Sequence, residues 1–162
     1  MKLYIREKVF SWGDKFTVKD QFGNDKYMVQ GEVFSLGKKL HVYDMTGNEV
    51  AFIKQEIWSL LPKYYVFRNG DQVAEIRKEF TFLFPKYSIA GLGWEINGNF
   101  MEHNYEITKS GNSIVTIRKE WMTWGDSYEL DIANPADELV ALAVVMTIDC
   151  VNEANSSFRN NH

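Results

Sequence analysis

A pattern of hydrophobic and polar positions recurs along this chain, and each copy ends in a short alternating segment. Five copies are complete, and a sixth, degraded copy ends at residues 104–107. The complete copies span residues 8–18, 32–42, 56–66, 79–89 and 120–130. The hydrophobic residues that close the six copies are spaced by 24, 24, 23, 18 and 23 positions, and they are Val18, Val42, Val66, Ile89, Ile107 and Leu130. Such a repeat predicts a fold assembled from similar supersecondary units.

Each repeat is predicted to contain two antiparallel strands. In the closing segment, Phe16 and Val18 share one face and Thr17 lies on the other, a period of two that is typical of a half-buried strand. Gly beside Asn or Asp follows in nearly every repeat, as at residues 46–48 and 69–71, and this pairing is typical of tight hairpins. Six hairpin repeats therefore predict about twelve consecutive antiparallel strands.

The last part of the chain breaks this pattern and predicts a helix. Asn134 is a favoured N-cap residue, Pro135 suits the first helical position, and two acidic residues follow. Residues 139–148 are then apolar except for Thr147 and leave no polar face. A helix of this kind must be buried on all sides. We predict a helix from about Pro135 to about Cys150.

The strands and the helix together predict one architecture. A sheet of about twelve strands tends to close, and a closed barrel of that size has a bore wider than its own side chains can fill. A central apolar helix would fill that bore. We therefore predict a mainly β, closed antiparallel barrel around a central C-terminal helix. Residues 1–151 would form a single domain with its strands within residues 3–132, followed by a polar tail at 152–162.

Composition narrows the classes of function. Hydrophobic residues make up 45% and charged residues 25% of the 162 residues, as in ordinary globular proteins. One Cys excludes an intramolecular disulfide framework and a Cys-based zinc site. A net charge of −4 and a pI near 5.4 argue against a nucleic-acid partner.

Targeting features are not expected in this sequence. Residues 1–8 carry scattered charges without an apolar core, which does not fit a signal peptide. The longest apolar run, residues 139–148, is about half of the roughly 20 residues that a transmembrane helix needs. We expect a cytoplasmic protein with a reduced Cys150, one that could be peripheral at a membrane.

The order of twelve strands and one apolar helix resembles the Tubby C-terminal-like fold. Within that fold, the segments at residues 8–11, 16–20 and 43–44 resemble the LURP-one-related family, in particular its short bacterial YxjI-like members. The resemblance covers essentially the whole chain. It implies relatives of three kinds: Tubby proteins that bind phosphoinositides, phospholipid scramblases, and members of unknown role.

Catalytic and metal-binding patterns are not expected to carry function here. His41, His103 and His162 form no short-spaced ligand pair and are interpreted as solvated surface residues. Cys150, near the end of the predicted helix, is interpreted as a buried inert thiol. No nucleophile motif, phosphate loop or dinucleotide fingerprint occurs. We expect no enzymatic activity, no metal and no cofactor.

Five lysines at equivalent turn positions form the candidate site. Equivalent turns of an up-and-down barrel gather at one end, so these lysines would share a rim: Lys15, Lys38, Lys39, Lys63 and Lys86. Apolar residues accompany them: Trp12, Leu36, Leu60, Leu61, Leu83, Phe84 and Trp124. Lysines beside Trp and Leu are attracted to anionic lipid surfaces. In the alternative interpretation, the apolar residues fold inward to cap the lumen and leave ordinary solvated lysines.

These features predict a non-enzymatic binding module that contacts anionic phospholipid or a protein partner. The alternative is a scramblase-like protein that handles phospholipid. Neither requires a nucleic acid or a cofactor.

Overall fold

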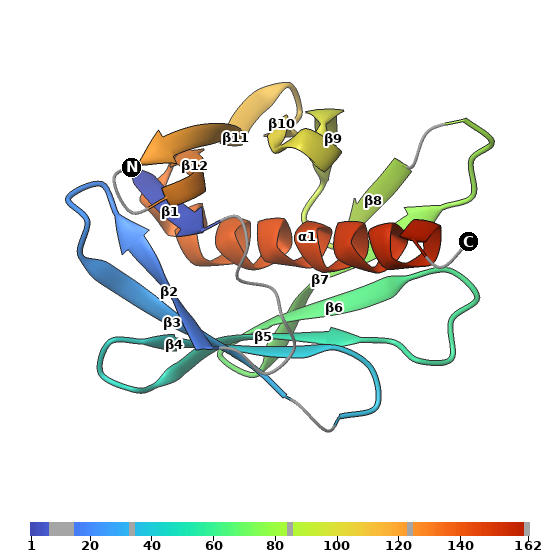
Figure 1. Cartoon of the computed structure of the whole chain (residues 1–162), viewed down its shortest axis with the longest axis horizontal. Coiled ribbons are helices and arrows are strands. Elements are labelled where there is room, and N and C mark those ends of the chain that lie inside the picture. The colour runs from blue at the N-terminus through green and yellow to red at the C-terminus, as the bar shows by residue number, and fades with distance from the viewer. Residues whose placement is uncertain (7–14, 33–34, 84–85, 123–124, 161–162) are drawn as a thin grey trace.

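A computed structural model describes residues 1–6, 15–32, 35–83, 86–122 and 125–160 of the chain. Within these ranges, twelve strands form one antiparallel sheet that wraps around the C-terminal helix (Figure 1). The strands are β1 (Lys2–Arg6), β2 (Lys15–Asp20), β3 (Asp25–Gly31), β4 (Lys39–Asp44), β5 (Glu49–Gln55), β6 (Lys63–Arg68), β7 (Asp71–Glu79), β8 (Lys86–Ala90), β9 (Trp94–Asn99), β10 (Asn104–Lys109), β11 (Asn112–Met122) and β12 (Gly125–Ile132). The helical elements are the 3₁₀ turns η1 (Phe100–Glu102) and η2 (Pro135–Asp137) and the helix α1 (Glu138–Asn160).

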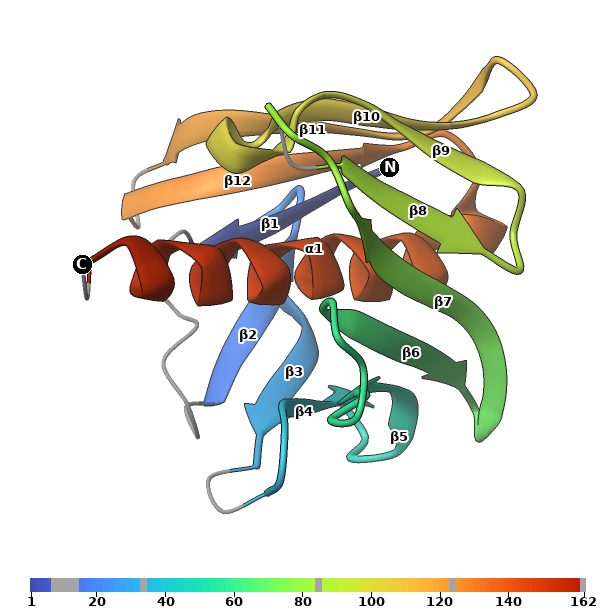
Figure 2. The same cartoon turned by 90° about the vertical axis from the view of Figure 1, so that its right-hand side faces the viewer.

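The first and last strands of the chain, β1 and β12, pair with each other in the middle of the sheet. Sequential strands pair with each other on both sides of the β1–β12 ladder, in which Leu3 lies opposite Leu130. The order is β8-β7-β6-β5-β4-β3-β2-β1-β12-β11-β10-β9, so β8 and β9 are the two edges of the sheet. These edges lie side by side without a ladder between their described residues (Figure 2). The predicted strand count, antiparallel order and central helix are confirmed, and the barrel is nearly closed.

The core lies between the inner face of the sheet and the helix. Residues 140–151 of α1 are buried, because the barrel surrounds this part of the helix. The aromatic residues at one inward position of successive repeats are also buried, as the alternation predicts: Phe16, Tyr64, Tyr87, Tyr105 and Tyr128. Burying a large apolar side chain stabilises the fold by about 1.5–3 kcal/mol. The contacts between helix and barrel are therefore a major source of stability.

The helix begins as predicted but ends later than predicted. The Asn134 side chain accepts a hydrogen bond from the Ala136 backbone N–H at 3.0 Å, and Pro135 opens the 3₁₀ turn that precedes α1. The predicted end near Cys150 is too early, because α1 continues to Asn160 through most of the expected polar tail. Asn152 Nδ2 donates to the Phe100 carbonyl at 3.1 Å, which holds the helix beyond the apolar run. No described helix is both long enough and apolar enough to cross a membrane.

A buried polar cluster joins the helix to the β9–β10 connection. Asp149 accepts a hydrogen bond from the Tyr128 hydroxyl, and its other oxygen lies 2.9 Å from His103 Nε2. The His103 ring stacks on Tyr128 with a centroid distance of 4.1 Å. The expectation that His103 is a solvated surface residue is therefore wrong, because the turn folds back over the barrel end and places the ring against α1.

Replacing Leu142 by Ala tests the role of the central helix. Leu142 is fully buried in α1, and Leu→Ala at such a site lowers the free energy of unfolding by about 2–5 kcal/mol. Leu60 is fully exposed, and the same substitution there should change that free energy by no more than about 0.5 kcal/mol. Urea unfolding measures both values. Equal effects of the two substitutions would contradict a stabilising role for the buried helix.

Candidate interaction surface

The exposed large hydrophobic side chains gather at one end of the barrel. This end carries the β3–β4, β5–β6 and β7–β8 connections, η1 and the C-terminal part of α1. We call its exposed hydrophobic residues the apolar rim, and they are Leu36, Ile57, Trp58, Leu60, Phe80, Phe82, Leu83 and Met101. Among described residues, the large hydrophobic side chains exposed elsewhere are Met1, Phe22 and Met45. The clustering therefore belongs to one end of the molecule.

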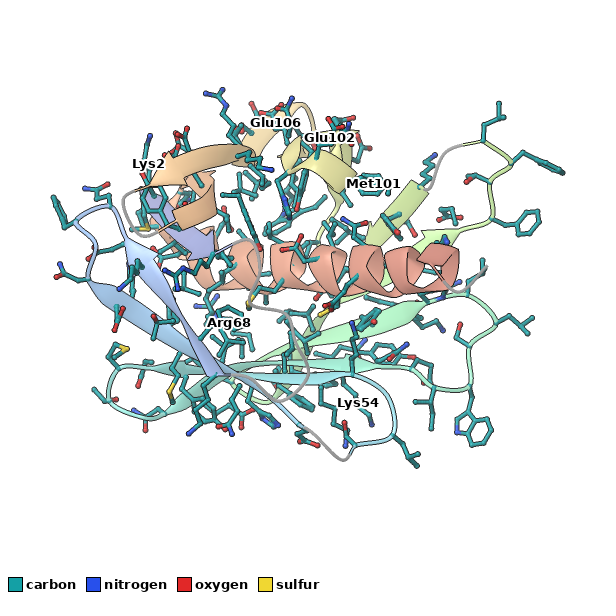
Figure 3. The ribbon with its side chains drawn as sticks, in the orientation of Figure 1. Lys2, Lys54, Arg68, Met101, Glu102 and Glu106 are labelled. Atoms are coloured by element: carbon teal, nitrogen blue, oxygen red, sulfur yellow. The ribbon has the colours of Figure 1, made fainter. Side chains whose placement is uncertain are left out.

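The rim side chains project away from the barrel. Trp58 is 89% exposed, Leu60 103% and Phe82 96%. The loops that carry them extend beyond the last ladder pairs of β5, β6 and β7, and side chains stand clear of these loops in Figure 3. The alternative in which the apolar residues fold inward is wrong for Leu36, Leu60 and Leu83, because the helix already fills the lumen. Leu61 is half-buried.

Hairpin turns at the opposite end have a different chemistry. Asp44 accepts hydrogen bonds from the Thr46 hydroxyl at 2.7 Å and from the Asn48 backbone N–H at 3.0 Å. These bonds hold the pKa of the Asp44 carboxyl below its usual range. Asp20 accepts from the backbone N–H groups of Phe22 and Asn24 in the same way. One end of the barrel thus presents acidic, internally bonded turns, and the other presents protruding apolar loops.

Three of the five predicted lysines are held in ion pairs. Lys38 is only 11% exposed and lies 3.0 Å from Glu153, with a second contact to the Cys150 carbonyl at 3.3 Å. Lys39 lies 3.5 Å from Glu32, and Lys63 lies 3.8 Å from Glu75. These three side chains contribute to the wall of the barrel and to its contact with α1.

Lys15 and Lys86 differ from the other three. Each is exposed at the first residue of its strand on the rim end, and neither forms an ion pair with a described residue. Of the apolar residues predicted beside the lysines, Trp12, Phe84 and Trp124 lie outside the described residues.

The prediction did not include five of the eight rim residues: Ile57, Trp58, Phe80, Phe82 and Met101. Each of these residues lies in a segment between two alternating runs. The signal that could have identified them is bulky hydrophobic residues at loop positions, where polar turn residues are usual.

Comparison with known proteins agrees with this architecture. The family model described as LURP-one-related matches residues 1–149. The chain belongs to the LURP-one-related family. An uncharacterised protein of Bacillus subtilis (strain 168), YxjI, is 36% identical over 151 residues, and the alignment covers 93% of both chains. An X-ray structure of an Arabidopsis thaliana protein has a TM-score of 0.63 at 17% identity and covers 92% of this chain and 90% of its own. The fold expected from the resemblance is confirmed.

Cys150 and the histidines of this LURP-one-related chain were the remaining candidate groups. Burial raises the pKa of the Cys150 thiol to about 12, which disfavours the nucleophilic thiolate. Within the described ranges, no group of three His, Cys, Asp or Glu side chains could hold a metal ion. The expectation of a solvated His41 is wrong, because its Nδ1 lies 2.6 Å from Glu49 and its Nε2 lies 2.7 Å from Glu32.

The ion pair between Lys38 and Glu153 predicts that replacing Lys38 lowers stability more than replacing the exposed Lys86. Replacing Lys38 by Met removes charged hydrogen bonds to α1 and should lower the free energy of unfolding by about 1–3 kcal/mol. Lys86→Met changes an exposed side chain and should have an effect within about 0.5 kcal/mol. Urea unfolding compares the two variants. An unchanged free energy of unfolding in Lys38→Met would contradict the role of Lys38 in anchoring α1.

The His41 cluster predicts a pH-dependent contribution to stability. Partial burial lowers the pKa of His41, but the hydrogen bonds to Glu32 and Glu49 outweigh it and raise the pKa above 6.5. A raised folded-state pKa stabilises the fold below pH 6.5, and this contribution is lost as the pH rises through the folded-state pKa. The stability gap between the unmodified chain and His41→Asn should therefore be larger at pH 6 than at pH 9. Urea unfolding at the two pH values measures it, with the exposed surface substitution Glu95→Gln as the control. A gap that does not change with pH would contradict the charged cluster.

Proposed function

We propose that this LURP-one-related chain is a binding module that docks its apolar rim into the interfacial region of an anionic membrane. The observation that carries the proposal is the gathering of exposed Trp, Phe, Leu, Ile and Met side chains at one end of the barrel. Exposed apolar groups at one site on a folded protein usually mark an interaction surface.

The form of the rim favours a lipid surface over a protein surface. Protein interfaces have a packed apolar core with high shape complementarity. The rim instead consists of side chains on separate hairpin connections, and Trp58, Leu60 and Phe82 are almost fully exposed. Separate protruding side chains can each enter a fluid interface without a complementary pocket, and Trp and Phe are favoured at the headgroup level.

Two exposed lysines at the rim end, Lys15 and Lys86, can contact anionic headgroups. Charges of both signs occur at each end, because exposed Glu102 lies at the rim end and exposed Lys109 lies at the other end with the acidic turns of Asp20 and Asp44. Each basic residue near an anionic leaflet contributes about 1 kcal/mol. The acidic turns would then point away from the lipid.

Several rim residues must insert together for the proposed binding. Burial of each large apolar side chain contributes about 2 kcal/mol. Three such insertions and two lysines contribute about 8 kcal/mol, and the cost of immobilisation is subtracted from this gross value. No covalent step and no bound group is needed for this activity.

Vesicle flotation tests the proposal. The chain should float with phosphatidylcholine vesicles that contain phosphatidylglycerol and should bind less to phosphatidylcholine alone. The double substitution Trp58→Ser and Leu60→Ser should weaken binding more than about tenfold, since it removes two exposed anchors and tenfold corresponds to about 1.4 kcal/mol. Phe22→Ser is the matched control, because Phe22 is 79% exposed at the opposite end.

Charge variants complete this experiment. Lys15→Glu with Lys86→Glu should reduce flotation with anionic vesicles, whereas Lys109→Glu at the opposite end should not. Equal flotation with neutral and anionic vesicles, or an equal loss for Phe22→Ser, would overturn the proposal. In the same vesicles, a membrane-docking module leaves the transbilayer movement of a labelled lipid unchanged, and faster movement would support the scramblase-like alternative.

A further inference from the structure

The seam between β8 and β9 contains a groove that the barrel leaves uncovered. All other neighbouring strands in the described sheet are joined by ladders, whereas these two edges are not. A groove of about 490 Å³ lies along the seam, and its walls come from β8, β9, η1 and the β7–β8 connection. This volume is within the range of about 300–1,000 Å³ that is typical of sites for small ligands.

The lining of the groove is mainly apolar. Tyr87 from β8 and Phe100 from η1 meet edge to face across the seam, with ring centroids 4.8 Å apart. Ile96 lines the wall on β9, and Phe82 and Leu83 line the mouth. Tyr87 is buried and Phe100 is half-buried, so the base of the groove is fixed by packing against the core. The lining therefore suits an apolar ligand group.

Among the described residues that line the groove, one side chain is cationic. Lys86 lines it, is exposed, and forms no ion pair with a described residue. The groove also adjoins the apolar rim, because Phe82 and Leu83 belong to both. A ligand with an apolar chain and a negative head matches this combination of lining and charge.

We propose that the seam groove binds one acyl chain of an anionic bilayer lipid, with the headgroup against Lys86. This inference rests on the proposed function, because docking of the rim brings the mouth of the groove to the lipid surface. The acyl chain then leaves the bilayer beside Phe82 and Leu83 without crossing water. The rim attaches the module to the membrane, and the groove selects anionic lipid within it.

A monomeric lysolipid separates the groove from the rim. Lysophosphatidylglycerol below its critical micelle concentration presents one acyl chain and one negative headgroup without a bilayer. Isothermal titration calorimetry should show saturable binding of one molecule to the intact chain. Lysophosphatidylcholine with the same chain should bind about tenfold more weakly, because its headgroup carries no net negative charge for Lys86 to attract.

Substitutions at Thr81 and Lys86, two exposed residues that line the groove, test the proposed binding of lysolipid. Thr81→Trp places a large side chain at an exposed position of the groove wall and should lower lysolipid affinity at least about tenfold. Lys86→Glu should abolish the preference for phosphatidylglycerol over phosphatidylcholine. Lys109→Glu, an exposed lysine at the other end, should change neither affinity.

The two proposals fail in distinguishable ways. Leu60→Ser should weaken vesicle flotation but leave lysolipid binding intact, because Leu60 does not line the groove. Lack of saturable lysolipid binding, with vesicle flotation retained, would overturn the groove assignment alone. Lysolipid binding that is unaffected by both Thr81→Trp and Lys86→Glu would also overturn it.

Discussion

Residues 139–148 have no polar face, and the lumen of the barrel is where this chain can bury them. The dependence is mutual, because a barrel of this size without the helix would enclose space that its own side chains do not fill. Leu142, Val144 and Met146 are fully buried against the inner face of the sheet. The fold is therefore stabilised from its axis outward, and the strands and the helix form one core.

Because the buried core lies along the axis of the barrel, the loops at the barrel ends contribute little to it. At the helix C-terminal end, a few specific contacts fasten the connections to α1: His103 with Asp149, Phe100 with Asn152 and Lys38 with Glu153. The tips of the connections lie beyond these contacts and are exposed to solvent. An apolar residue such as Trp58 at a tip contributes little to the core, because it is almost fully exposed.

The wall of the barrel was predictable from sequence because its constraints are local and repeated. Alternation around Val18, Val42 and Val66 indicates which face of each strand is buried, and all three are buried. The partners of the lysines were not predictable from this local pattern. Lys38 lies one position before the repeat position that Lys39 and Lys86 share, and its partner is Glu153, far along the chain on the helix. The late end of α1 depends on similar tertiary contacts, which a local pattern does not contain.

Incomplete closure of the barrel links the seam to the rim. Unpaired strand edges are usually a liability, since they can pair with other chains. Here the short strand β8 limits the exposed edge, and the Tyr87–Phe100 ring pair covers the base of the gap with side chains instead of backbone hydrogen bonds. A continuous β8–β9 ladder would bring the two backbones together and remove the space that Ile96 and Lys86 now line. The open seam and the apolar loops therefore form one continuous surface at the end of the barrel where the buried helix emerges.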